Sequence, residues 1–129
     1  TEHDRRHEML REYLAAGTPN NREVAGAIRP LLEAFLRVAC PEYFRPGMLL
    51  GPFRDLCARR VGTSQEILDR QAAQELRDLI EDANKFHHDT NAAWETEAIN
   101  DGELQGFVRR ALRFATPFGT RILSAGETP

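Results

Sequence analysis

The stretch from residue 20 to residue 39 limits the fold most, because its apolar residues recur at helical spacing over a wide face. These apolar residues are Val24, Ala25, Ile28, Leu31, Leu32, Phe35, Leu36 and Val38. A stripe this wide is typical of a helix covered on several sides, so we expect it at the centre of the molecule. Pro30 lies inside the pattern and lacks a backbone N–H, which predicts a kink or a helix restart near Gly26–Arg29.

Four further segments show apolar residues at helical spacing, and they cover residues 3–16, 52–60, 64–87 and 101 to about 115. The helix over residues 64–87 is expected to begin at a cap formed by Thr63 or Ser64, with Glu66 near the capping-box position. A break in this helix is expected near Asp69. Asn100 or Asp101 is expected to cap the N-terminus of the last helix, which covers residues 101 to about 115. The loop between the second and third helices carries two aromatic residues that we expect to be exposed, Tyr43 and Phe44.

The order of these segments predicts an all-α fold, a bundle of about five helices in one domain over residues 1–129. No segment shows a convincing alternation of apolar and polar residues, the pattern that indicates a β-strand. We expect the second, fourth and last helices to form the core and residues 117–129 to be a frayed tail.

The overall composition excludes some classes of function and leaves others open. The net charge of −3 gives no overall electrostatic footprint for nucleic acid, although a local arginine patch can still bind phosphate. The sequence contains no run of about 18 apolar residues, which a membrane span would need, and no signal peptide is visible. A cytoplasmic protein is therefore expected. Cys40 and Cys57 stand in apolar helical patterns and are expected to be buried free thiols.

Three charged residues of the second helix, Arg29, Glu33 and Arg37, follow one another in steps of four and interrupt its apolar stripe. Burial of such groups is costly unless they are paired. They are therefore either an Arg–Glu–Arg ladder at the edge of the core or an inward-facing polar site. In the second case two guanidinium groups would bind phosphate and the carboxylate would orient them.

The stretch Asn84–Asp89 holds two of the four histidines and the only lysine of the chain. A histidine titrates near neutral pH, so His87 or His88 is a candidate general acid or base. Two alternatives remain open. The histidines can be caps that interact favourably with the helix dipole, or they can bind a metal together with Asp89, as His3 and His7 can at the first helix.

Combined, the two sets of residues match the needs of RNA cleavage by internal transesterification. That reaction needs a base for the 2′-OH proton, an acid for the leaving 5′-oxygen and cations for the charge that develops at phosphorus. A histidine, one or two arginines and a carboxylate supply these roles, so no cofactor is expected. DNA lacks the 2′-OH nucleophile, and the substrate would have to be RNA.

Arg29-x-x-x-Glu33 followed by a distant histidine resembles the Arg/Glu/His set of bacterial anticodon nucleases of the PrrC and RloC type. Asn84-Lys85-Phe86-His87-His88 resembles the Arg-Asn-x-x-x-His motif of the HEPN helical ribonucleases, with His88 as the final histidine and Ala83 where the arginine is expected. The run of residues 28–37 looks like the C-terminal region of long bacterial AAA/ABC-type ATPases related to those nucleases. The resemblance covers roughly residues 22–115.

This resemblance implies a HEPN-like helical bundle, often a homodimer, that acts on RNA such as tRNA and is fused to a defence-type ATPase. No P-loop is present here, and the chain begins with Thr1, so a domain of a longer protein is expected. By the same resemblance His88 is the general acid or base, and Arg29 stabilises phosphate charge. Glu33 orients Arg29 or His88, and Asn84 positions the scissile phosphate. Arg37 and His87 are second choices for the catalytic set.

Two other functions remain open. The first is a non-catalytic helical module for dimerisation or partner binding, in which Arg29, Glu33 and His88 form a buried network. The absence of the motif arginine at Ala83 favours this module. The second is a metal-dependent hydrolase that uses His87, His88 and Asp89.

Overall fold

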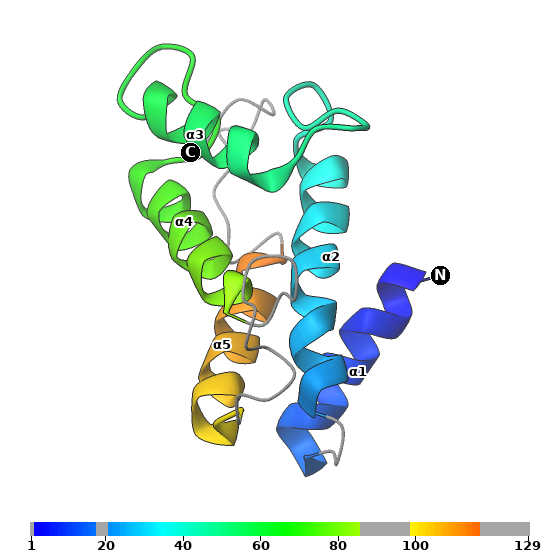
Figure 1. Ribbon diagram of the computed structural model, residues 1–129. Helices are drawn as coiled ribbons and strands as arrows, with labels where there is room; N and C mark the ends of the chain where they lie inside the picture. The colour runs from blue at the N-terminus through cyan, green and yellow to red at the C-terminus, as the bar shows by residue number, and fades with distance from the viewer. Residues whose placement is uncertain (1, 18–20, 86–98, 117–129) are drawn as a thin grey trace.

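The structure, a computed structural model, describes residues 2–17, 21–85 and 99–116, and this part of the chain forms five helices (Figure 1). They are α1 (Glu2–Ala16), α2 (Asn21–Ala39), α3 (Leu50–Arg60), α4 (Arg70–Asn84) and α5 (Asp101–Phe114). The prediction of an all-α bundle of about five helices is confirmed, and the predicted tail lies outside the described residues. None of these helices is long and apolar enough to cross a membrane.

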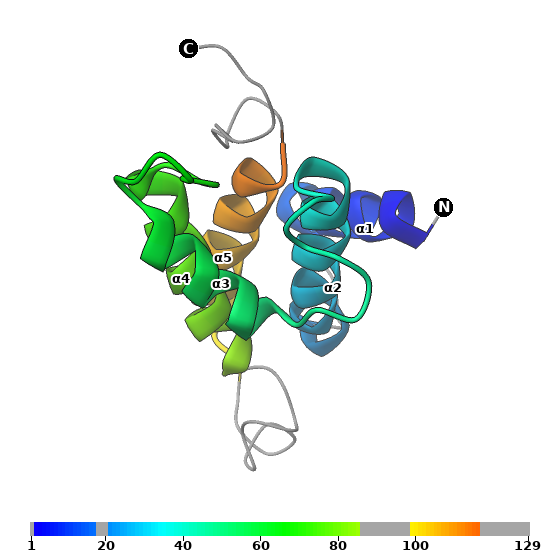
Figure 2. The ribbon, with the colours of Figure 1, turned by 90° about the horizontal axis from the view of Figure 1, so that it is seen from above.

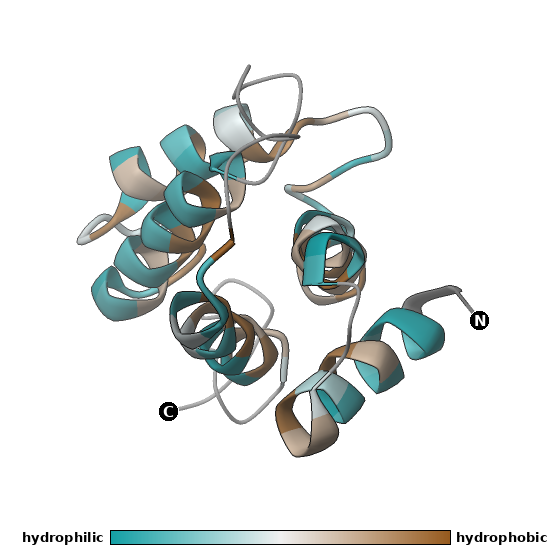
Figure 3. Cartoon of the chain, turned by 60° about the horizontal axis from the view of Figure 1, so that its bottom comes forward, coloured by the Kyte–Doolittle hydropathy of each residue, from teal (hydrophilic) through white to brown (hydrophobic). Residues whose placement is uncertain are grey.

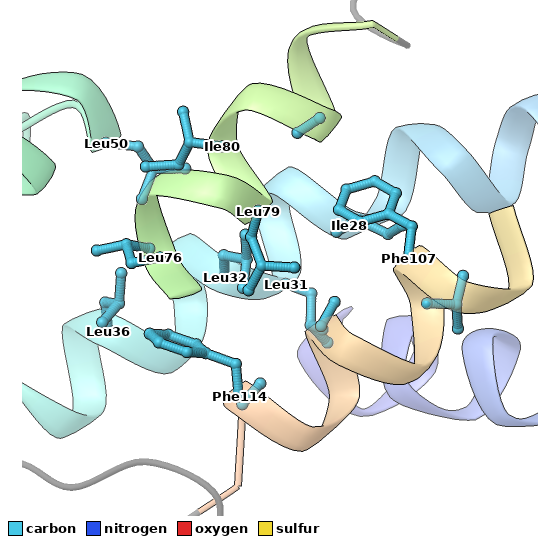
Figure 4. Close-up of a cluster of buried hydrophobic side chains, with 14 of the residues drawn as sticks. Ile28, Leu31, Leu32, Leu36, Leu50, Leu76, Leu79, Ile80, Phe107 and Phe114 are labelled. Carbon is cyan, nitrogen blue, oxygen red and sulfur yellow. The ribbon is translucent and has the colours of Figure 1, made fainter. Parts of the chain in front are cut away.

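Helix α2 is the central helix, as its wide apolar stripe predicts. It packs against α1, α4 and α5, and Figures 1 and 2 show it between α1 and the α4–α5 pair. The close-up in Figure 4 shows apolar side chains from α2, α4 and α5 in one cluster. Among the labelled residues, the α2 side chains are Ile28, Leu31, Leu32 and Leu36. In Figure 3 the outer side of α4 is mostly hydrophilic, so the apolar surface is turned toward this core.

Two details of α2 differ from the sequence prediction. The helix runs without a restart from Asn21 to Ala39 with Pro30 inside it, because fully buried Ile28 and Leu31 flank the proline and hold both turns against the core. Val38 is 83% exposed rather than inward-facing. It follows buried Leu36 by two residues, about 200° around the helix, and therefore points to the opposite side.

The local capping signal predicts the wrong start for α4. The helix begins at Arg70, where Asp69 Oδ1 accepts a hydrogen bond from the Ala72 N–H at 2.8 Å. Glu66 instead accepts from the Gly62 N–H at 2.8 Å and belongs to the turn after α3. Ile67 and Leu68 are both fully buried between that turn and α4, so core packing fixes the later helix start. The end of α4 lies at Asn84 rather than His87.

The loop between α2 and α3 carries a buried aromatic residue. Phe44 is 1% exposed, which contradicts its predicted exposure, and its ring meets the Phe53 ring edge to face at 5.0 Å between centroids. Tyr43 is half-buried. The loop is therefore a packed connection, and α3 begins at Leu50, two residues before the predicted position.

Candidate functional site

The middle of α2 meets the end of α4 at Arg29 and Asn84. Arg29 Nη1 donates a hydrogen bond to Asn84 Oδ1 at 3.1 Å in a partly buried setting. The two residues are 55 positions apart in the sequence and belong to different halves of the predicted site. Buried residues stand next to both of them, Ile28 on α2 and Ala83 on α4, and the two helices pack against each other. The structure therefore joins two of the predicted site residues.

Glu33 and Arg37 do not form the predicted ladder with Arg29. Arg29 turns toward α4, and the Arg37 guanidinium lies over the Phe44 ring, with Cζ 5.2 Å from its centroid. Glu33 is half-buried and makes no hydrogen bond or ion pair within the described residues. The ladder prediction is wrong because each arginine contacts a residue outside α2, Asn84 for Arg29 and Phe44 for Arg37, instead of Glu33.

The histidines of the candidate site, His87 and His88, lie outside the described residues, as does Asp89. Their roles in acid–base or metal chemistry stay predictions. Ala83, which stands where the resembled motif has arginine, is 4% exposed and part of the core. A cation at this place must come from another residue, and Arg29 contacts the neighbouring Asn84.

An ion-pair cluster between α4 and α5 was not predicted. Arg110 Nη2 lies 2.7 Å from Glu75 Oε1, and Arg110 Nη1 lies 2.7 Å from Asp82 Oδ2. Asp82 also lies 3.6 Å from Lys85 Nζ. Burial alone would lower the pKa of Arg110, but the hydrogen bonds and charges of Asp82 and Glu75 outweigh it and raise the pKa above its usual value. Arg110 thus fixes α5 against α4 through Glu75 and Asp82.

A pocket of about 340 Å³ lies beside this cluster, between the end of α4 and the first half of α5. It is lined by Asp82, Lys85, Gly102, Glu103, Gly106, Phe107 and Arg110. The walls carry charges of both signs, and the Arg110 guanidinium is already engaged by two carboxylates. This arrangement does not single out one class of ligand.

The remaining reactive groups of the described chain have structural surroundings. Cys40 and Cys57 are free and buried, and burial raises the pKa of the two thiols to about 11 and about 12. Because the thiolate is the nucleophile, neither thiol suits catalysis at neutral pH. In the described residues no group of three or more His, Cys, Asp or Glu side chains could hold a metal ion.

Comparison with protein-family models, with curated proteins and with solved structures gave no match to this chain. Its function must therefore be inferred from the residues that the fold brings together.

Proposed function

We propose that this chain is a HEPN-like endoribonuclease domain that cleaves RNA by internal transesterification without a metal ion. The observation that carries the proposal is the Arg29–Asn84 hydrogen bond. It places the α2 arginine of one motif beside the asparagine of the other. The predicted reaction needs these two groups at one phosphate.

In the proposed reaction the 2′-OH of one nucleotide attacks the adjacent phosphorus. One base takes the 2′-OH proton, the bond to the 5′-oxygen breaks, and an acid protonates that leaving oxygen. The products are a 2′,3′-cyclic phosphate and a free 5′-hydroxyl. His88 is the proposed acid or base, and His87 is its alternative.

Arg29 is proposed to stabilise the negative charge that develops on the phosphoryl oxygens. A guanidinium has five N–H donors, and the bond to Asn84 uses one of them. Within the described residues no other hydrogen bond from the Arg29 side chain is found. Its plane is thus held by Asn84 while other donors can contact a phosphate. Glu33, one turn further along α2, is proposed to orient Arg29 or His88.

The partners follow from the resemblance of Arg29 and Glu33 to the anticodon nucleases and of Asn84–His88 to the HEPN ribonucleases. On that basis tRNA is the proposed substrate class, and the chain is proposed to act as a homodimer fused to a defence-type ATPase in the cytoplasm.

The deciding experiment is incubation of the chain with total tRNA, with and without a chelator. We expect fragments that end in a 2′,3′-cyclic phosphate, in equal amounts under both conditions. Substitution His88→Ala should abolish cleavage, whereas His7→Ala on α1 serves as the matched control and should cleave normally. Intact tRNA, or cleavage that the chelator stops, would contradict the proposal. A fully active His88→Ala variant would remove His88 from the mechanism.

The second candidate is a non-catalytic helical module. Two observations favour it: Ala83 occupies the motif position of the arginine and is buried in the core, and Arg29 is itself tied to Asn84. In this case Arg29 is a structural residue. Its replacement would then lower stability, and no tRNA fragments would form with the unsubstituted chain.

A further inference from the structure

Three arginines surround the turn that follows α2, and none of them belongs to the Arg29–Asn84 contact. Arg37 lies over Phe44, with Cζ 5.2 Å from the ring centroid, and Arg60 lies over Tyr43 at 5.4 Å. Arg45 Nε donates to the Glu42 carbonyl oxygen at 3.2 Å. All three guanidinium groups are thus held by residues 42–44, and together we call Arg37, Arg45 and Arg60 the arginine triad.

The positive charge of the arginine triad is not compensated locally. Within the described residues no carboxylate lies in ion-pair contact with any of the three, whereas Arg54 pairs with Asp55 at 3.0 Å. Residues 37–60 contain five arginines against Glu42 and Asp55, a local balance of +3 in a chain of net charge −3. The acidic average of the whole chain therefore conceals a basic stretch from the end of α2 to the end of α3.

The aromatic contacts also prepare these side chains for binding. Phe44 is fixed by its edge-to-face contact with Phe53, so Arg37 rests on a rigid ring. A stacked guanidinium keeps its N–H edge available in the ring plane and loses less rotamer freedom when it binds an anion. Two apolar side chains that flank the turn, Val38 and Leu49, are 83% and 63% exposed. Exposed apolar surface therefore flanks the same turn as the arginine triad.

We propose that the arginine triad binds phosphate groups of the RNA backbone away from the bond that is cleaved. The identification of the ligand as RNA rests on the proposed function. Arg37 follows Arg29 by eight residues, about 12 Å along the axis of α2, and the two guanidinium groups are held by different neighbours, Phe44 and Asn84. An RNA strand with its scissile phosphate at Arg29 can therefore reach the triad with a different phosphate. Phosphate also matches the planar fork of arginine.

The test is fluorescence anisotropy of labelled total tRNA with the full chain over a series of salt concentrations. The double variant Arg37→Gln/Arg60→Gln should bind roughly tenfold more weakly or worse. Its slope of log affinity against log salt should fall by about one for each phosphate that the triad no longer binds. The control Arg11→Gln/Arg109→Gln removes the same charge from exposed positions on α1 and α5 and should keep the original slope. A charge-preserving Arg37→Lys/Arg60→Lys variant should show an intermediate loss of affinity, because lysine cannot stack as a fork.

Several results would overturn the triad proposal. The first is unchanged affinity and salt slope in the Arg37→Gln/Arg60→Gln variant. The second is an equal loss of affinity in the Arg11→Gln/Arg109→Gln control. The third is that polyglutamate, at the same total charge, competes for binding as effectively as unlabelled tRNA. Circular dichroism verifies that each variant is folded. Failure of the two proposals can be told apart. Triad-dependent binding without cleavage contradicts only the nuclease, and cleavage with triad-independent binding contradicts only the triad. Absence of any tRNA binding contradicts both.

Discussion

Arg29 Nη1 lies 3.1 Å from Asn84 Oδ1, so a single charge-assisted hydrogen bond connects the middle of α2 with the last residue of α4. The last carbonyl groups of a helix lack intrahelical partners and carry partial negative charge, which favours a cation at this end. Arg29 thus brings a cation to the side chain of the last residue of α4. The contact has a structural and a chemical consequence, and each can be measured.

The structural consequence is an energetic coupling between the two side chains. We expect Arg29→Ala and Asn84→Ala, each alone and together, to give a double-mutant cycle with a coupling of about 1 kcal/mol in the free energy of unfolding. The measurement is urea unfolding followed by circular dichroism. Asn84→Ala combined with Arg109→Ala, an exposed position on α5, should be additive. Additivity of the Arg29 pair as well would show that the bond does not contribute to stability.

The Arg110 cluster should contribute to stability in a salt-dependent way. Arg110→Ala removes both bonds to Glu75 and Asp82, and we expect a loss of about 1–2 kcal/mol, kept small because all three side chains are about a third exposed. Arg110→Lys should recover only part, since an ammonium group cannot bond both carboxylates as a fork. Urea unfolding at low salt and at about 1 M salt is the measurement. An equal loss at both salt concentrations would assign the effect to packing instead of charge.

Most of the fold could be predicted from the sequence because long periodic patterns decide it. The wide stripe of α2 requires neighbours on several sides, and Asn100 is a side-chain cap whose Oδ1 accepts from the Glu103 N–H at 3.0 Å. The start of α4 could not be predicted in the same way. Thr63 and Glu66 give a local capping signal, but burial of Ile67 and Leu68 after them is a tertiary effect that local spacing does not encode.

The candidate site could be predicted in part for a similar reason. Motif spacing predicts Arg29 and Asn84 in one site, and they are in contact. The partner of Arg37 and the carboxylates around Arg110 could not be predicted. Each depends on how a side chain crosses to another element, which the sequence spacing within one helix does not specify.

Two glycines in helical surroundings should respond to alanine with opposite signs. Gly26 is exposed inside α2, and a Cβ there meets nothing within 4 Å, so Gly26→Ala should stabilise the fold by about 0.5–1 kcal/mol. Gly17 ends α1 with φ of +76°, where a side chain is strained, so Gly17→Ala should cost about 1 kcal/mol. Thermal unfolding of both variants is the measurement. A destabilised Gly26→Ala protein would indicate that α2 is not a regular helix at this turn.

The contact between α1 and α5 should make stability decrease at high pH. Tyr13 donates a hydrogen bond to Asp101 Oδ1 at 3.0 Å, and burial first, then this bond and the negative charge of Asp101, raise the pKa of Tyr13 from 10.0 to about 12. The unfolded chain loses the tyrosine proton first. The contribution of the Tyr13 hydroxyl to the free energy of unfolding is therefore fully present below about pH 10, and it is lost as pH rises toward about 12.

Tyr13→Phe isolates that effect from the titration of the two buried thiols. The pKa values of Cys40 and Cys57 are also raised, but both thiols are present in the two proteins and contribute equally to each. At neutral pH we expect the variant to be less stable by about 1 kcal/mol through loss of the hydrogen bond. The difference should shrink as pH rises through the window from 10.0 to about 12. Urea unfolding of both proteins across this range is the measurement. A constant difference at all pH values would contradict the raised pKa of Tyr13.

In the proposed nuclease, the chemical consequence of the Arg29–Asn84 contact would be an effect on the rate of tRNA cleavage. If Arg29 stabilises charge that develops at phosphorus, Arg29→Gln should lower kcat roughly a hundredfold or more, the effect expected from removing one donor to such a charge. Arg29→Lys keeps the charge without the fork and should retain more activity.

Asn84→Ala tests whether Asn84 positions the Arg29 guanidinium, and here we expect a smaller loss of activity than in Arg29→Gln. The matched control is Arg109→Gln, which removes an exposed arginine of α5 and should cleave normally. Denaturing gels under single-turnover conditions, with circular dichroism to verify folding, give the rates. A folded Arg29→Gln protein that cleaves at the original rate would make the α2–α4 contact purely structural, because no transition-state charge would then depend on its guanidinium.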